Sequence, residues 1–148
     1  MIKSNSIKAT GAVQVILRDA NNCIKQSFTV KNLVVDSGLE YIAELLGFTG
    51  PNQMSHMALG TSNTAAAAGN TQLTTQLGAR SSLVSTTAVD NTVEFVADFA
   101  AGANTGAITE AGIFNASTAG TMLCRTVFAV VNKGALDSMT ITWTITIS

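Results

Sequence analysis

The sequence predicts a mainly β protein: an antiparallel β-sandwich, jelly-roll-like in topology, with one short helix at about residues 37–46. The clearest observation is the stretch from Met139 to Ile147, where large apolar residues alternate strictly with threonines. Such alternation places one row of side chains in a core and the other on the outer face of a strand. Strand patterns recur about eight times between turn-forming clusters, whereas a helical spacing occurs once.

The first predicted element is a β-hairpin over residues 9–32. Val13, Val15 and Leu17 fall on one face of its outgoing strand, and the Asp-Ala-Asn-Asn sequence that follows suits a tight turn. Apolar and polar residues alternate again after this turn, which predicts the return strand.

A helical spacing follows the hairpin. Apolar residues recur at intervals of three and four, and the inward face is predicted to consist of Leu39, Ile42, Ala43 and Leu46. Asp36 or Ser37 is expected to cap the free amides at the start of this helix, and Gly47 is expected to end it.

The middle of the chain is predicted to contain one short strand and one long loop. A Gly-Pro-Asn turn at residues 50–52 precedes the strand, which covers residues 55–59. Residues 61–79 are rich in Ala, Thr, Asn and Gly and form a long exposed connection, a type of segment that is usually functional or mobile.

Five further strands are predicted at residues 82–88, 92–100, 107–114, 121–132 and 138–148. In the second of these, Phe95 and Phe99 are expected to face inward, and Glu94 and Asp98 outward. With residues 1–8 as an N-terminal arm, residues 9–148 are predicted to form a single domain.

The composition favours a protein that lies against neighbours. The 148 residues are 47% hydrophobic but only 11% charged, less than half of the roughly 25% that is typical. A surface of Thr, Ser, Asn, Gln, Ala and Gly is cheap to desolvate. The net charge of −1 and the lack of a basic run give nucleic-acid binding no electrostatic support.

No membrane span and no secretory signal are predicted, because no apolar run reaches about 18 residues and the first residues lack an apolar core. We therefore expect a cytosolic product. Cys23 and Cys124 have no nearby metal-ligating partners, and they are interpreted as buried or half-buried thiols, with a single disulfide as the alternative.

The sequence offers little for catalysis. His56, the only histidine, lies between Met54 and Met57 without a neighbouring His, Cys or carboxylate, so we interpret it as a structural or surface residue. Glu40 and Glu44 suit the solvated face of the helix. We predict no enzyme activity, no catalytic residue, no metal and no cofactor.

One strand carries a carboxylate that calls for explanation. Glu110 lies in an apolar stretch near Gly112, and a glycine within a strand usually marks a bulge or the close approach of another backbone. Two interpretations stay open: an outward-facing polar residue, or a structural carboxylate that accepts bonds from backbone amides. Catalysis is the weakest alternative.

Three segments resemble small structural proteins of tailed bacteriophages. The sequence Gly-Ala-Ile-Thr-Glu-Ala-Gly-Ile-Phe at residues 106–114 is similar to their Ile-Thr-Glu-x-Gly-Leu/Ile-Phe motif. Residues 32–42 match an Asn-Leu-Val-x-x-x-Gly-Leu-x-x-Ile segment. A Leu-Gly-Thr-x-x-Thr-Ala element followed by Leu-x-x-x-Leu and a basic residue is similar to residues 59–65 with Leu73, Leu77 and Arg80.

This resemblance, over about residues 30–148, implies a phage virion protein. The resemblance implies one of two roles. The first is a decoration (cement) protein that binds the outer head shell and bridges subunits of the major capsid protein. The second is a tail, baseplate or fibre-associated structural or receptor-binding module. Cement proteins sit at threefold positions, which favours a homotrimer on the capsid surface, assembled in the host cytoplasm.

The arm and the long loop are the expected contact segments. The expected contact residues are Met1, Ile2, Lys3, Ile7, Thr61, Asn63, Thr64 and Asn70. A carbohydrate-binding module is a further alternative because jelly rolls often bind sugars, but aromatic residues, which stack on sugar rings, make up only 5% of the chain.

Overall fold

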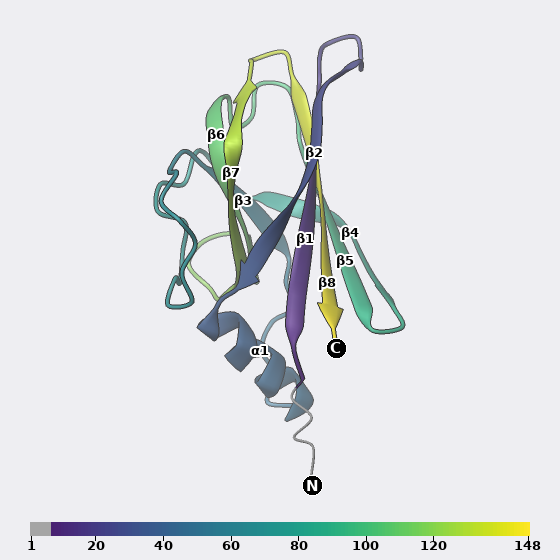
Figure 1. Cartoon of the computed structure of the whole chain (residues 1–148), viewed down its shortest axis with the longest axis vertical. Helices are drawn as coiled ribbons and strands as arrows, with labels where there is room; N and C mark the ends of the chain where they lie inside the picture. Colours follow the sequence, from purple (N-terminus) through teal and green to yellow (C-terminus); the bar gives the residue numbers. More distant parts are fainter. Residues whose placement is uncertain (1–6) are drawn as a thin grey trace, which may run out of the picture.

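A computed structural model describes residues 7–148, and within them the chain forms eight strands and one helix (Figure 1). The elements are β1 (Ala9–Arg18), β2 (Ile24–Val34), α1 (Asp36–Leu46), β3 (His56–Gly60), β4 (Ser81–Val89), β5 (Thr92–Phe99), β6 (Gly106–Phe114), β7 (Met122–Lys133) and β8 (Ser138–Ile147). All pairings are antiparallel, in the order β1-β2-β7-β6-β3-β4-β5-β8.

The predicted mainly β, antiparallel chain with one short helix is confirmed, but the jelly-roll-like sandwich is corrected to a closed barrel. A broad side, β2-β1-β8-β5-β4, meets a narrow side, β7-β6-β3, at two corners. At each corner, β2 with β7 and β3 with β4, only two residue pairs join the strands. Alternation shows which side chains face inward but not whether the sheet edges meet, because sandwiches and barrels have the same inward and outward faces.

The barrel interior follows the predicted alternation. On β8, Met139, Ile141, Trp143 and Ile145 are buried, while the intervening threonines are half-buried on the outer face. β8 lies between β1 and β5 in continuous register, so its inward row packs against those of both neighbours. These neighbouring rows comprise Val13, Val15, Leu17, Phe95, Ala97 and Phe99.

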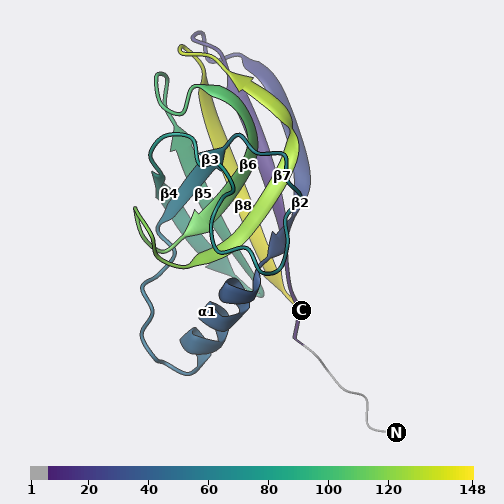
Figure 2. The same cartoon turned by 90° about the vertical axis from the view of Figure 1, so that its left-hand side faces the viewer.

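Helix α1 lies across one end of the barrel (Figures 1 and 2), and its predicted inward face is right only for Ile42, which packs against the core. Leu39 and Leu46 are 48% and 79% exposed. The helix instead turns toward the barrel a stripe one residue earlier in the sequence, which consists of Gly38, Tyr41 and Ile42, with Leu45 at its edge and 43% exposed. This stripe has the same three- and four-residue spacing. It includes a glycine because the Leu123 carbonyl lies where a Cβ would be.

The predicted caps of α1 are half right. Val35 occupies the N-cap position without a side-chain cap, so the prediction for Asp36 or Ser37 is wrong, and the Ser37 hydroxyl donates to the Met122 carbonyl instead. Gly47 ends the helix as predicted. No helix in the described part of the chain has the length and apolar character to cross a membrane.

The two cysteines are free and differ in environment. Cys23 is exposed in the β1–β2 turn, contrary to the prediction of a buried or half-buried thiol, whereas Cys124 is fully buried in the barrel. Burial raises the pKa of the Cys124 thiol far above its usual range, so this thiol is not reactive near neutral pH.

Two cations and one carboxylate fasten the loops at the end of the barrel opposite α1. The buried Lys133 ammonium donates to the carbonyls of Ala100, Ala103 and Asp137 at 2.7–2.9 Å. The Asp137 carboxylate accepts hydrogen bonds from the Lys25 ammonium and the Gly134 amide, each at 2.8 Å. These bonds, from the Lys25 ammonium first, hold the pKa of Asp137 below its usual value.

The lowered pKa of Asp137 predicts a contribution to stability that acid removes. A carboxyl whose pKa falls on folding stabilises the native state above its unfolded pKa of about 4, and this stabilisation is lost as pH falls through the folded pKa. We expect the urea midpoint to fall less between pH 7 and pH 2 in Asp137→Asn than in the unsubstituted protein. Equal losses in both would contradict this role.

Candidate functional site

Residues 61–79, here called the strap, cross the outer face of β3, β6 and β7 (Figure 2). The strap has no regular secondary structure apart from a single bridge between Gly60 and Gln76. It is a long and mostly exposed connection, as predicted, and polar groups of the sheet below bind it at several points.

Glu110 is the principal anchor of the strap. It lies on the outer face of β6, next to a register shift, with a side-chain exposure of 0%. Its Oε1 accepts the amides of Thr75 (2.8 Å) and Ser62 (3.3 Å), and its Oε2 accepts the amide of Thr74 (3.1 Å). Glu110 is therefore the structural carboxylate of the second interpretation, which accepts hydrogen bonds from backbone amides.

Arg125 on β7 is the second anchor, and sequence reasoning missed it. Its Nη2 and Nε donate to Glu110 Oε2 at 2.8 and 3.0 Å, and it too is fully buried. Nη2 also lies within hydrogen-bonding distance of the Thr64 carbonyl (2.8 Å) and the Thr74 hydroxyl (3.1 Å), and Nη1 donates to the Asn70 amide oxygen at 3.1 Å. The available signal was a lone arginine within an apolar strand, matched by a lone glutamate in the preceding strand.

The strap satisfies a pair of charges that could not otherwise be buried. Desolvating an ion pair costs several kcal/mol per ion unless further hydrogen bonds compensate. Here the strap supplies those bonds. Its backbone amides donate to Glu110, and its carbonyl oxygen at Thr64 accepts from Arg125. The conformation of the strap and the burial of the charges therefore depend on each other.

An apolar cluster completes the layer beneath the strap. It consists of Val35, Ala58, Leu73, Phe114 and Met122. Leu73 of the strap packs over Gly112, and a Cβ added to Gly112 would lie 3.0 Å from the Cδ2 of Leu73. Gly112 thus marks the close approach of another chain segment, as the sequence indicated.

Arg80 fastens the far end of the strap. Its guanidinium lies 3.5 Å from the centroid of the Phe114 ring. It also donates to the carbonyls of Ala116 and Ala119, at 3.0 and 2.8 Å, and to the Gln76 side chain. Stacking on an aromatic ring combined with directional hydrogen bonds suits arginine better than lysine.

The predicted contact residues have three different settings. Thr61, Asn63 and Thr64 are exposed on the strap, whereas Asn70 is half-buried and its side chain binds Arg125 and the Ala67 amide. Ile7 is 77% exposed at the start of the described chain, just before Lys8 pairs with Ser148 through backbone bonds. Met1, Ile2 and Lys3 lie outside the described residues.

His56 lies between two hydroxyl groups. Its Nδ1 is 2.8 Å from the Ser55 hydroxyl and its Nε2 is 3.3 Å from the Ser82 hydroxyl. A nucleophilic serine needs a histidine that a third group orients and a cavity for the substrate; both ring nitrogens of His56 instead lie against hydroxyl groups. The described residues contain no cluster of three or more His, Cys, Asp or Glu side chains able to hold a metal ion.

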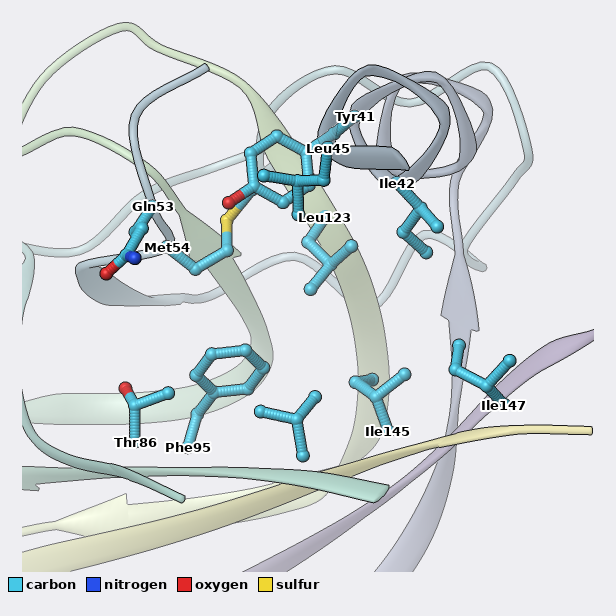
Figure 3. A pocket seen from close by; sticks show the side chains of 11 residues that line it. Tyr41, Ile42, Leu45, Gln53, Met54, Thr86, Phe95, Leu123, Ile145 and Ile147 are labelled. Atoms are coloured by element: carbon cyan, nitrogen blue, oxygen red, sulfur yellow. The ribbon is translucent and has the colours of Figure 1, made fainter. Parts of the chain in front are cut away.

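An apolar cavity of about 390 Å³ lies where α1 meets the barrel (Figure 3). Tyr41, Ile42 and Leu45 line it from the helix, and Phe95 and Ile145 line it from the strands opposite. Its size and lining suit an apolar side chain or a small apolar molecule. Sequence reasoning did not predict this cavity, because the cavity depends on how the helix packs against the barrel.

No protein-family model matches the chain, and no curated protein or solved structure is similar to it.

The close fit around Glu110 predicts a sensitive glycine. At Gly60, an added Cβ would lie 2.5 Å from the Thr75 carbonyl and also meet Glu110 Oε1. We expect Gly60→Ala to lower the free energy of unfolding in urea by about 1–3 kcal/mol, as overpacking does. The control Gly69→Ala, on the strap with nothing within 4 Å, should change it by less than about 0.5 kcal/mol. Equal effects would refute the close fit.

Breaking the ion pair should release the strap. Glu110→Gln leaves the Arg125 charge buried without its partner, which we expect to cost about 3–5 kcal/mol of unfolding free energy. Hydrogen exchange should show lost protection at the Thr74 and Thr75 amides. Glu94→Gln, an exposed carboxylate on β5, is the control. Unchanged protection of both amides in Glu110→Gln would contradict the anchoring role.

Proposed function

We propose that this protein is a non-enzymatic structural component of a tailed-phage virion, and most specifically a decoration protein. In this role it binds the outer head shell and stabilises it by bridging subunits of the major capsid protein. A tail, baseplate or fibre-associated module is the alternative that the same resemblance supports.

One observation carries the proposal. Two of the three motifs that resemble phage virion proteins, at residues 106–114 and 59–80, are separate in the sequence but meet at the strap. Glu110 binds the strap amides, Leu73 packs on Gly112, and Arg80 stacks on Phe114. Motifs matched by chance would have no reason to converge in this way, so their convergence supports the resemblance.

The strap has the properties of a contact element. Its exposed residues Thr61, Asn63 and Thr64 are uncharged and therefore inexpensive to desolvate. Since the strap is already fixed by Glu110 and Arg125, binding does not have to order it, and ordering a backbone residue costs about 1–2 kcal/mol. Weak contacts of this kind, repeated over a shell, add up to firm attachment.

The experiment has a compositional and a functional arm. Mass spectrometry of purified phage particles, combined with gold labelling of the chain in electron micrographs, determines whether it is present and whether it lies on the head or the tail. In the functional arm, purified protein is added to heads that lack it. We expect Asn63→Lys on the strap to weaken binding and lower the heat resistance of the heads, and Gln14→Lys on β1 to change neither.

Each outcome has a distinct meaning. Label on the head supports decoration, label on the tail supports the alternative, and absence of the chain from particles refutes both. The homotrimer expected from the resemblance is tested separately by the mass of the purified protein in solution.

A further inference from the structure

Strand β4 has a free edge within the described part of the chain. It pairs with β5 along most of its length, but β3 contacts its other edge only at Ser81 and Ser82. One further backbone bond, from Leu83 to Ser55, ends this contact. Residues 84–89 are all exposed, and their outer edge has no partner strand.

This edge lacks most of the features that normally prevent strands from pairing with other molecules. Edge strands are usually protected by a charge, a proline, a β-bulge or very short length. Residues 81–89 read Ser-Ser-Leu-Val-Ser-Thr-Thr-Ala-Val, with no charge and no proline. The register shift between Leu83 and Ser85 leaves residues 85–89 as a regular strand, and Val84 and Val89 are each 58% exposed. An edge of this kind is expected to be covered.

The edge is complementary to itself. Antiparallel pairing of two copies about a twofold axis at Thr87 places Thr87 opposite Thr87, Thr86 opposite Ala88, and Ser85 opposite Val89. Threonine pairs are favourable across antiparallel strands. Thr86 also lines the apolar cavity, so the second strand would lie beside that cavity. In this register residues 85–89 place no charge opposite another charge, and the next pair outward sets Asp90, in the turn, opposite Val84.

The nearest fixed charge does not oppose this pairing. Glu94 on β5 lies opposite Thr87, so the two Glu94 side chains of a pair would be separated by three strand spacings. That separation is about 14 Å, which exceeds the screening length of about 8 Å at physiological ionic strength. A charged extended peptide would fit this edge less well than a second copy of β4, because residues 81–89 carry no charge that could pair with the charges of the peptide.

We infer that the free edge of β4 is a self-association site, where a second copy of this chain adds its own β4 and joins two broad barrel sides into one continuous sheet. The contact is isologous, since the same surface is used by both copies. It does not rest on the proposed virion role. The same contact can form between two monomers or between two of the homotrimers that the resemblance implies.

The test uses the full chain with opposite charges at the twofold axis. Sedimentation equilibrium from about 1 μM to about 1 mM measures association. We expect Thr87→Lys and Thr87→Glu to weaken it at least about tenfold each, because each places like charges opposite one another. An equimolar mixture of the two variants should restore it. Gln14→Lys, an exposed site on β1 within the same side of the barrel, should have no effect.

A second arm gives a direct distance. In a Cys23→Ser background, where the remaining Cys124 is buried, a short bismaleimide should cross-link Thr87→Cys chains to one another and leave Gln14→Cys chains uncoupled. The inference is overturned if the unsubstituted protein shows no concentration-dependent association. It is also overturned if the charge mixture fails to restore association, or if the two cysteine variants cross-link equally.

Discussion

The buried pair formed by Glu110 and Arg125 is the constraint on which the outer layer of this protein depends. Both side chains are fully buried, and each has more hydrogen-bonding capacity than the other can satisfy. The surplus is met by the backbone and side chains of the strap, which for this reason has a fixed path without helix or strand. A segment of small, weakly apolar residues thereby becomes an ordered part of the molecular surface.

Several of the few charges in the chain serve internal purposes. Lys133 binds three carbonyls, Asp137 binds Lys25 and the Gly134 amide, and Arg80 stacks on Phe114. With only eight basic and nine acidic residues in total, such use leaves a surface dominated by Thr, Ser, Asn and Ala. This surface can lie against neighbours at a low desolvation cost, which supports the proposed role in assembly.

The sequence predicted the strands well, because alternation reflects the one requirement that each strand bury a single face. It did not predict closure of the barrel, since the two corners depend on two residue pairs each. The face of α1 was misjudged because its true stripe includes Gly38, which an apolar pattern does not count. In the anchor, Glu110 was recognised as unusual and Arg125 was not, because a partner fifteen residues away across a turn leaves no local spacing to recognise.

The uneven joining of the barrel has a mechanical consequence. β1 and β8 share ten residue pairs, whereas β2 and β7 share two and β3 and β4 share two. We therefore expect thermal opening to begin at the corners, where the fewest residue pairs join the strands. In the proposed role on a shell, small movements at these corners would let the protein follow changes in shell curvature without unfolding.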